Sequence, residues 1–278
     1  MKEYKSFYKS VGGNEGSKCH YNTRLDTYGC GCQHDCSYCY AKSLLNFRGL
    51  WDAANPAAAD IDKIRRKIKS IPAGTPAIRL GGMTDCFQPL EATHRVTYET
   101  IKALNEANQP YLIVTKSDLV ARDDYLDVMD KDLAHVQVTI TCFNDGQYRD
   151  LAYEKASLPS RRIAAVEKLQ TNGFDVAVRL SPLIPEYVDY DRLADIECDK
   201  LLVEFLRVNT WIKRWFDIDY SKYTLKQGGY LHLPLEEKKA IMAKIHGYKE
   251  VSVCEDEDEA YAYWRDHVNP KDDCCNLR

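Results

Sequence analysis

Short apolar stretches alternate with amphipathic ones along most of the chain, and this alternation restricts the fold more than any other feature of the sequence. The stretches YLIVTK, HVQVTIT, FDVAVRLSPL and KLLVEFLRV are typical of buried strands, and the segments between them have the apolar spacing of helices. Apolar strands separated by amphipathic helices indicate a parallel sheet covered by helices. The sequence predicts an α/β fold of about six such units, arranged as a barrel or as a doubly wound sheet.

The two ends of the chain do not share this alternation. Residues 1–28 lack a clean periodicity, and beyond about residue 215 only one clear helix, LEEKKAIMAKIHG, and an acidic run, EDEDE, remain. We therefore expect residues 1–215 to form a core with an irregular N-terminal lead-in, and residues 216–278 to form a C-terminal extension. The acidic run is typical of a solvated helix start, where the helix dipole favours carboxylates.

The composition predicts a protein of a reducing compartment that does not span a membrane. No run of about 18 apolar residues is present and the N-terminus is too polar for a signal peptide, so we expect a cytoplasmic protein. In reducing cytosol the eleven cysteines are expected to serve metals or catalysis rather than disulfides. The net charge of −4 gives no general attraction to a phosphate backbone, so nucleic-acid binding would need a local basic surface.

Three of these cysteines lie in one short loop. Cys32, Cys36 and Cys39 follow the spacing C-x3-C-x2-C. Three thiolates can hold three irons of a cubane cluster and leave the fourth iron open to an external ligand. A closed zinc site is the alternative, and it would need Cys30 or His34 as a fourth ligand. The loop alone is compatible with both kinds of metal site.

The loop resembles the C-x3-C-x-aromatic-C signature of the radical S-adenosylmethionine (SAM) superfamily, with Tyr38 as the aromatic residue. The turn at residues 81–85, after a predicted strand, is similar to the glycine-rich turn that meets the SAM amino group in that family. Segments that resemble the spore photoproduct lyase branch are TDCFQPLE (84–91), TKSDL (115–119), HVQVTIT (135–141) and SLPSRRIAAVEKLQTNGFDVAVRLSPLIP (157–185). The resemblance covers about residues 28–210.

This resemblance implies a fold and a chemistry. The fold is a partial (β/α)6 barrel of the TIM type, with the cysteine loop after the first strand. A [4Fe-4S] cluster is bound by Cys32, Cys36 and Cys39, and the amino and carboxylate groups of SAM chelate the open iron. One electron from the cluster cleaves the S–C5′ bond, which releases methionine and a 5′-deoxyadenosyl radical that abstracts hydrogen from a substrate. Such an enzyme is oxygen-sensitive and needs a reductant such as flavodoxin or ferredoxin.

The resemblance also implies which residues contact SAM. Tyr38 would lie beside the cluster and the adenine, where an aromatic face packs well. Lys116, after the third strand, can place its ammonium against the SAM carboxylate. Thr139 falls where the lyase branch has a hydroxyl residue that faces SAM, and Ser117 is a further hydroxyl candidate. The residues predicted to bind SAM are Tyr38, Gly81, Gly82, Met83, Thr84, Asp85, Lys116, Ser117 and Thr139.

The sequence departs from the lyase at the hydrogen donor. The lyase carries a donor cysteine immediately ahead of the turn, whereas Gly82 or Met83 holds that place here. The nearest thiol is Cys86, on the far side of Asp85. Cys86 is our candidate catalytic residue, as a hydrogen donor or second redox group, and the alternative is a buried small apolar side chain. We therefore do not predict repair of a thymine dimer.

The remaining cysteines divide into two groups. Cys142 follows a strand and could face the pocket, whereas Cys198 lies in a predicted helix and is expected to be inert. A second metal site could assemble between the extension and the lead-in, although the spacing does not establish one. Its candidate ligands are Cys19, Cys30, Cys254, Cys274 and Cys275.

Basic and aromatic residues accumulate in the second half of the core. They could bind a nucleotide or a nucleic-acid strand by phosphate pairing and base stacking, or they could be ordinary surface and core. The basic residues are Arg161, Arg162, Arg179, Arg207, Lys213 and Arg214, and the aromatic ones are Tyr187, Tyr190, Trp211, Trp215 and Phe216.

The sequence thus predicts a radical SAM enzyme of the lyase or transferase type that attacks a nucleic-acid base or nucleotide, by resemblance to one branch. Modification of a peptide or small metabolite is the alternative reaction. A non-catalytic iron–sulfur or zinc-binding protein is the alternative class. The sequence does not disclose the substrate, or whether SAM is consumed or regenerated.

Overall fold

The computed structural model describes residues 4–9, 18–150, 156–269 and 272–277. Its centre is an eight-stranded sheet in which β1 is antiparallel to β2 and all other neighbouring strands are parallel. The strands, in spatial order, are β1 (Phe7–Lys9), β2 (Thr23–Leu25), β5 (Ile78–Leu80), β6 (Tyr111–Thr115), β7 (Ala134–Thr139), β8 (Asp175–Leu183), β9 (Lys200–Phe205) and β12 (Glu250–Cys254).

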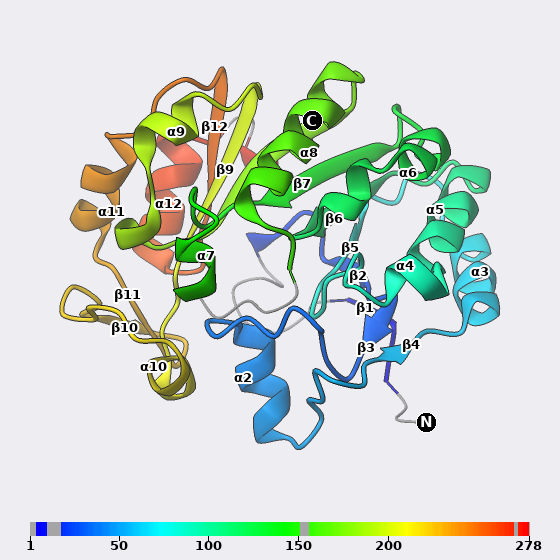
Figure 1. Cartoon of the computed structure of the whole chain (residues 1–278), viewed down its shortest axis with the longest axis horizontal. Coiled ribbons are helices and arrows are strands. Elements are labelled where there is room, and N and C mark those ends of the chain that lie inside the picture. The colour runs from blue at the N-terminus through cyan, green and yellow to red at the C-terminus, as the bar shows by residue number, and fades with distance from the viewer. Residues whose placement is uncertain (1–3, 10–17, 151–155, 270–271, 278) are drawn as a thin grey trace.

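Helices cover the outer side of this sheet and connect its parallel strands (Figure 1). The connecting helices are α3 (Ile61–Lys69), α5 (Val96–Glu106), α6 (Asp123–Val128), α8 (Pro159–Thr171) and α9 (Tyr190–Ala194). The remaining elements are β3 (Tyr28–Gly29), α2 (Tyr40–Phe47), β4 (Ala57–Ala58), α4 (Glu91–His94), α7 (Gln147–Asp150), α10 (Thr210–Trp215), β10 (Leu225–Gln227), β11 (Tyr230–His232), α11 (Leu235–Met242), α12 (Asp258–His267) and the short 3₁₀ helices Asp118–Ala121 and Pro185–Tyr187.

The central strands are buried because helices shield one face while the other faces the interior. In β6, four of the five residues of YLIVT are buried, and its register pairs Ile113 with Leu80 of β5 and with Val136 of β7. These side chains belong to one large apolar core that also takes in the inner faces of the helices. The predicted α/β fold is confirmed: the sheet is mainly parallel and is consistent with a partial barrel.

The helix starts follow local capping chemistry. The side chain of Asp60 accepts hydrogen bonds from the N–H groups of Asp62 and Lys63, at 2.9 and 3.1 Å, and so begins α3. Ile64 and Ile68 then turn the apolar face of α3 into the core, as the spacing of the sequence predicts. None of the described helices is both long and apolar enough to span a membrane.

The predicted extension contributes to the main sheet. Its strand β12 pairs in parallel with β9, with Val253 opposite Val203. On the outer side of β12, the side-chain amide of Asn269 accepts from the N–H of Val253 at 2.7 Å and donates to its carbonyl at 3.0 Å. The boundary at residue 216 stays a prediction.

The acidic run starts a helix, as predicted, but it is only partly solvated: Asp258 and Glu259 are exposed, whereas Glu255 and Glu257 are buried. The carboxylate of Glu257 accepts from the N–H groups of Glu259 and Ala260, which begins α12. Glu255 is buried and forms an ion pair of 2.5 Å with Lys238, which is also buried. Because an unpaired buried charge is costly, this pairing is what allows Glu255 to leave the solvent.

Candidate functional site

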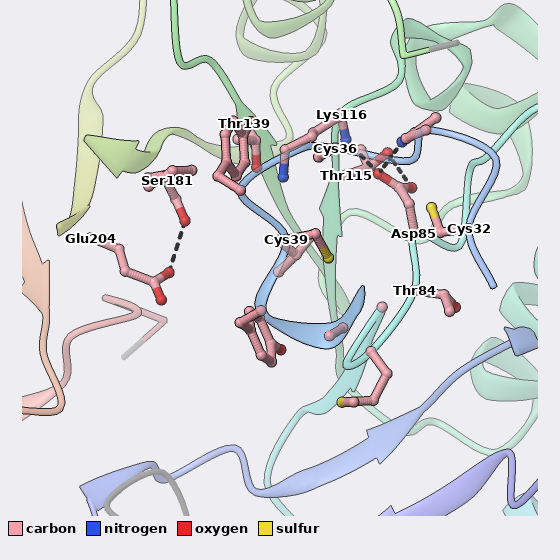
Figure 2. Close-up of a pocket in the computed structure, with 18 of the residues that line it drawn as sticks. Cys32, Cys36, Cys39, Thr84, Asp85, Thr115, Lys116, Thr139, Ser181 and Glu204 are labelled. Atoms are coloured by element: carbon pink, nitrogen blue, oxygen red, sulfur yellow. Dashed lines mark hydrogen bonds and ion pairs between the residues drawn. The ribbon is translucent and has the colours of Figure 1, made fainter. Parts of the chain in front are cut away.

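A pocket lies at the carboxyl ends of the parallel strands, where the cysteine loop meets the strand-end turns (Figure 2). One side of the pocket is formed by the loop, and the opposite side by the ends of β8 and β9. Of the predicted site residues, those lining the pocket are Cys32, Cys36, Tyr38, Cys39, Gly81, Gly82, Met83, Thr84, Asp85, Lys116 and Thr139.

Two tight turns space the thiols along the cysteine loop. The N–H of Asp35 donates to the carbonyl of Cys32, and the N–H of Cys39 donates to the carbonyl of Cys36, each at 3.1 Å. Cys39 then begins α2, since its Sγ accepts a hydrogen bond from the N–H of Lys42 at 3.4 Å. The loop thus presents three thiols to one pocket, as the spacing predicts.

The three thiols suit a multi-iron cluster better than a single ion. Burial raises the pKa of Cys36 to about 12, despite the nearby Lys116 ammonium, and raises that of Cys32 well above its usual value. They therefore need bound cations in order to ionise. Within the described residues, no group of three His, Cys, Asp or Glu side chains could hold one metal ion. Thiols that border one pocket without meeting at a point fit irons at separate corners of a cubane.

The possible fourth zinc ligands are placed elsewhere. Cys30 is buried and does not border the pocket among the described residues. His34 borders the pocket, but its Nδ1 lies 3.3 Å from a carboxylate oxygen of Asp85. Within the described residues, neither Cys30 nor His34 joins the three thiols in one ligand set for a single ion.

The glycine-rich turn after β5 has a backbone shape that needs glycine. Gly81 has φ of 83°, and a Cβ atom there would lie 2.9 Å from the carbonyl oxygen of Val114. Asp26, just after β2, accepts hydrogen bonds from the N–H groups of Gly82 at 2.7 Å and Met83 at 3.1 Å. Tyr8 donates to the same carboxylate at 3.0 Å. Asp26 therefore fixes the turn, a role that the sequence analysis missed.

Asp85 connects the turn to the end of β6. Its carboxylate accepts from the hydroxyl of Thr115 and the N–H of Lys116, each at 2.7 Å, and from the N–H of Phe87 at 2.8 Å. Burial alone would raise its pKa, but His34 and these hydrogen bonds hold the pKa below its usual value. Asp85 is thus an ionised anchor, and its contact with SAM stays a prediction.

The other predicted SAM residues differ in their positions. The Nζ of Lys116 lies 6.0 Å from the ring centroid of Tyr38, so both face the same part of the pocket. The carbonyl of Thr139 accepts from Nη1 of the buried Arg162 at 2.6 Å. Ser117 does not border the pocket; its hydroxyl instead accepts from the N–H of Leu119 at 3.3 Å. Their contacts with SAM stay predictions.

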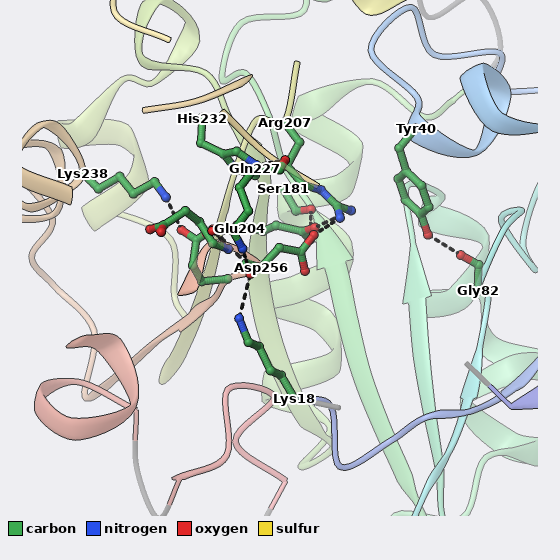
Figure 3. Close-up of polar contacts among 12 residues, drawn as sticks. Lys18, Tyr40, Gly82, Ser181, Glu204, Arg207, Gln227, His232, Lys238 and Asp256 are labelled. Atoms are coloured by element: carbon green, nitrogen blue, oxygen red, sulfur yellow. Dashed lines mark hydrogen bonds and ion pairs between the residues drawn. The ribbon is translucent and has the colours of Figure 1, made fainter. Parts of the chain in front are cut away.

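The wall opposite the cysteine loop is a charged network that the sequence analysis did not identify (Figure 3). Glu204 of β9 accepts from Nη2 of Arg179 and, at 2.8 Å, from the hydroxyl of Ser181. Arg207 lies 3.6 Å from the same carboxylate and also pairs with Asp256 of the extension. Burial would raise the pKa of Glu204, but the two guanidinium groups bring it down to about 2. Alternation in β8 places Arg179 and Ser181 on one face, which is the signal that could have revealed this network.

The candidate catalytic cysteine is not among the described residues that line the pocket, although its neighbour Asp85 is. Cys86 is fully buried in the apolar core, and its carbonyl accepts from the hydroxyl of Thr97 at 2.6 Å. Cys142 is fully buried too, and neither thiol is among the described pocket residues. The position of Cys86 matches the alternative of a small apolar side chain.

The prediction that Cys198 lies in a helix is wrong. It follows α9 in the loop before β9, with Sγ at 3.5 Å from the carbonyl of Val176 and 3.4 Å from that of Lys200. Helix α9 ends at Ala194, with Asp195 as its C-cap, so Cys198 lies beyond the helix. The thiols of the extension and lead-in pack in a small second apolar cluster, in which the described residues offer no site for a single ion. These cysteines are Cys19, Cys254, Cys274 and Cys275.

The predicted basic surface is divided by the fold. Arg162 is fully buried and Arg179 is almost so, whereas Arg161, Lys213 and Arg214 are exposed. These six residues therefore do not form one continuous surface; Arg179 and Arg207 line the pocket instead. The cause is the packing of two elements: β8 turns Arg179 inward, and Arg162 lies on the buried face of α8.

Solved structures of known proteins share the fold. A spore photoproduct lyase complexed with a dinucleoside spore photoproduct is similar in structure, with a TM-score of 0.61 and 17% identity over 84% of this chain and 76% of that one. Streptococcus suis SuiB bound to its precursor peptide SuiA gives a TM-score of 0.51 and 10% identity over 79% of this chain and 44% of that one.

Sequence relatives point the same way. An uncharacterised protein of Methanocaldococcus jannaschii is 29% identical over 58% of this chain, which spans 60% of that relative's length. The model of the Radical SAM superfamily matches residues 27–197, which include the cysteine loop, the glycine-rich turn and Lys116. Because the matched residues are more than half of the molecule, the chain belongs to the radical SAM superfamily of enzymes, whose cofactors are a [4Fe-4S] cluster and S-adenosylmethionine.

Proposed function

We propose that this chain, as a partial (β/α)6 barrel, uses the cluster and SAM to abstract hydrogen from a nucleic-acid base or nucleotide. Cys32, Cys36 and Cys39 would hold the cluster, and the turn at residues 81–85 would meet SAM. One observation carries the proposal: a single pocket has three thiols on one side, two of them buried and that of Cys39 half-buried, and arginines on the other. Cofactors and an anionic substrate would therefore share one space.

The bound cofactors would supply reductive cleavage of SAM and, with it, hydrogen-atom abstraction. The residues of the chain itself would bind and orient these cofactors. Asp26 and Asp85 hold the glycine-rich turn in shape through backbone N–H groups. Lys116 brings an ammonium group to the pocket, where it would pair with the carboxylate of SAM. The ring of Tyr38, nearly buried beside the thiols, would exclude water from the cluster.

The far wall supports an anionic, base-containing substrate. Arg179 and Arg207 border the pocket there and pair with two carboxylates, those of Glu204 and Asp256. Arg79 borders the same pocket, so guanidinium groups outnumber these two carboxylates. Guanidinium groups bind phosphate through paired hydrogen bonds, and the ionised Glu204 can accept from a base N–H. Tyr40 and Trp51 add aromatic surface on which a base could stack. The complex of spore photoproduct lyase with a dinucleoside is in keeping with this choice.

The reaction is not assigned as photoproduct repair. Gly82 and Met83 occupy the place of the donor cysteine, and the nearby Cys86 lies in the core. The described thiols that border the pocket are the three predicted cluster ligands. We therefore propose hydrogen abstraction as the common step and leave the product open to experiment.

Anaerobic reconstitution tests the proposal. The chain loaded with iron and sulfide, reduced with dithionite and given SAM, should form 5′-deoxyadenosine, and a single-stranded oligonucleotide should accelerate that formation. Deuterium transfer from a labelled oligonucleotide into 5′-deoxyadenosine would identify the atom attacked. Acceleration by peptides or small metabolites, but not by nucleotides, would replace the proposed substrate with the alternative.

A further inference from the structure

The surface just outside the cysteine loop exposes apolar side chains. The large apolar residues that are exposed in the described part of the chain are Leu44, Phe47, Leu50 and Leu158, with exposed fractions of 40%, 76%, 47% and 38%. Three of the four lie within seven residues, on α2 and directly after it. Exposed apolar side chains that gather in one place mark interaction sites more often than single ones do.

Helix α10 extends this surface. It lies beside α2 at the lower edge of the view in Figure 1, and the side-chain amide of Asn209 donates to the hydroxyl of Ser43 at 3.0 Å. The Nζ of Lys42 lies 5.0 Å from the ring of Trp215, which fixes the two helices further. We call this surface the α2–α10 face, and define it by Leu44, Phe47, Arg48, Leu50, Lys213 and Arg214.

The α2–α10 face is basic, although the whole chain is acidic. Residues 40–51 and 209–216 contain Lys42, Arg48, Lys213 and Arg214 and no aspartate or glutamate, whereas the net charge of the chain is −4. Lys42 is paired with Asp35 at 3.0 Å, so the positive charge of the face comes from the other three residues. Arg48, Lys213 and Arg214 are exposed. An acidic partner would thus be attracted to this face and repelled by much of the remaining surface.

The same face is close to the predicted cluster. Cys39 is the N-cap of α2, and a helix rises 1.5 Å per residue. Leu44 and Phe47 therefore lie roughly 8 and 12 Å along the helix axis from a cluster ligand. Because electron transfer slows steeply with distance, the outer surface of α2 is a short route from solvent to the cluster.

We propose that the α2–α10 face docks the electron donor, a small acidic redox protein that carries a flavin or an iron–sulfur group. The donor loses one electron and the cluster gains it, with no bond made or broken. The proposal rests on the cluster that superfamily membership implies, and it is independent of the substrate. Redox partners use small interfaces with charged rims around a few apolar contacts, which matches the size and character of this face.

The exposed side chains favour a protein over a nucleic-acid strand. Sequence-tolerant strand binding depends on aromatic rings that stack with bases. Phe47 offers one exposed ring, whereas Leu44 and Leu50 offer none. The rings of Trp211 and Trp215 are only half-exposed and pack against each other with centroids 5.7 Å apart, so successive bases would not find a series of rings. Aliphatic side chains beside cations fit an acidic protein surface.

The test compares two electron donors in the reconstituted chain. Reduced flavodoxin must dock, whereas dithionite is small enough to need no docking surface. The rate of cluster reduction is followed by stopped-flow absorbance, so that neither SAM cleavage nor a substrate enters the measurement. In the variants Leu44→Gln/Phe47→Gln and Lys213→Glu/Arg214→Glu, we expect reduction by flavodoxin to slow about tenfold, and reduction by dithionite to stay unchanged.

The matched control is Leu158→Gln, which removes an equally exposed leucine from another part of the surface. Iron content and circular dichroism confirm that each variant is loaded and folded, and calorimetry with oxidised flavodoxin measures binding directly. Wild-type rates and binding in both double variants would overturn the proposal, and so would an equal slowing in the control. Loss of oligonucleotide binding with unchanged flavodoxin kinetics would instead assign the face to nucleic acid. If oligonucleotides did not accelerate SAM cleavage, the proposed substrate would be wrong, but the result on flavodoxin docking would still stand.

Discussion

The carboxylate of Asp26 accepts a hydrogen bond of 2.7 Å from the backbone N–H of Gly82, although the two residues are 56 positions apart. This contact joins the end of the first parallel strand to the turn predicted to bind SAM. Since Asp26 also accepts from Met83, the turn depends on a carboxylate that has no contact with SAM in the proposal.

Replacing Asp26 with asparagine should therefore weaken SAM binding. The oxygen of an amide can accept from one N–H group, but its NH₂ faces the remaining donors. Each buried N–H group that loses its acceptor in this way costs about 1–3 kcal/mol of free energy. We expect the dissociation constant for SAM to rise about tenfold, measured by equilibrium dialysis with the reconstituted chain. Asp62→Asn is the control, because Asp62 is exposed on α3. Unchanged affinity in Asp26→Asn would mean that the turn does not need this anchor.

The three loop cysteines should each be required for iron. Alanine at Cys32, Cys36 or Cys39 removes one of the three thiolate ligands of the predicted cluster, and we expect bound iron to fall severalfold and 5′-deoxyadenosine formation to be lost. Iron analysis and visible absorbance after anaerobic reconstitution measure this. Cys198→Ala, away from the pocket, should keep its iron. Stoichiometric zinc with no iron in the wild-type chain would contradict the predicted ligand set.

Glu204 makes stability depend on pH. Its pKa is lowered from 4.5 to about 2 in the fold, so the unfolded chain binds the proton more readily. The carboxylate therefore stabilises the fold fully above about pH 4.5, and this contribution is lost as pH falls toward 2. We expect the advantage of the wild type over Glu204→Gln to be about 1 kcal/mol smaller near pH 3.5 than near pH 6, measured by urea unfolding. An equal advantage at both pH values would show that the ion pairs do not lower this pKa.

Cys86 offers a test of the hydrogen-donor prediction. Because its side chain is fully buried in the core, Cys86→Ala should cost about 1 kcal/mol of unfolding free energy and leave the rate of SAM cleavage within about twofold. Thermal unfolding and chromatography of 5′-deoxyadenosine measure the two effects. Intact SAM cleavage with no substrate product would indicate that Cys86 returns a hydrogen atom to the substrate after all.

Much of the fold could be predicted because its signals are local. The apolar run of β6 and the spacing of Ile64 and Ile68 in α3 depend on neighbours in sequence, and both predictions agree with the structure. The thiol spacing of the loop was equally local, and the loop brings Cys32, Cys36 and Cys39 to one pocket. The roles of the individual SAM residues stay predictions.

The charged parts of the site could not be predicted because their partners are remote in sequence. Glu204 is ionised at the edge of the pocket because the register of β8 and β9 places Arg179 beside it. From the sequence, Glu255 is expected to be solvated. In the fold, α11 places Lys238 beside it, although the two residues are 17 positions apart. Burial also separated Cys86 from the pocket, and the position of a residue just after a strand does not reveal which way its side chain turns.

The amide of Asn269, which engages both backbone groups of Val253, has a consequence for how copies of the protein meet. The terminal strand of a sheet ordinarily invites a strand from another molecule, and such pairing leads to self-association. Here one side chain takes the place of that foreign strand at the centre of β12. Asn269→Leu would expose these groups, and light scattering should then detect more self-association than in the unaltered chain.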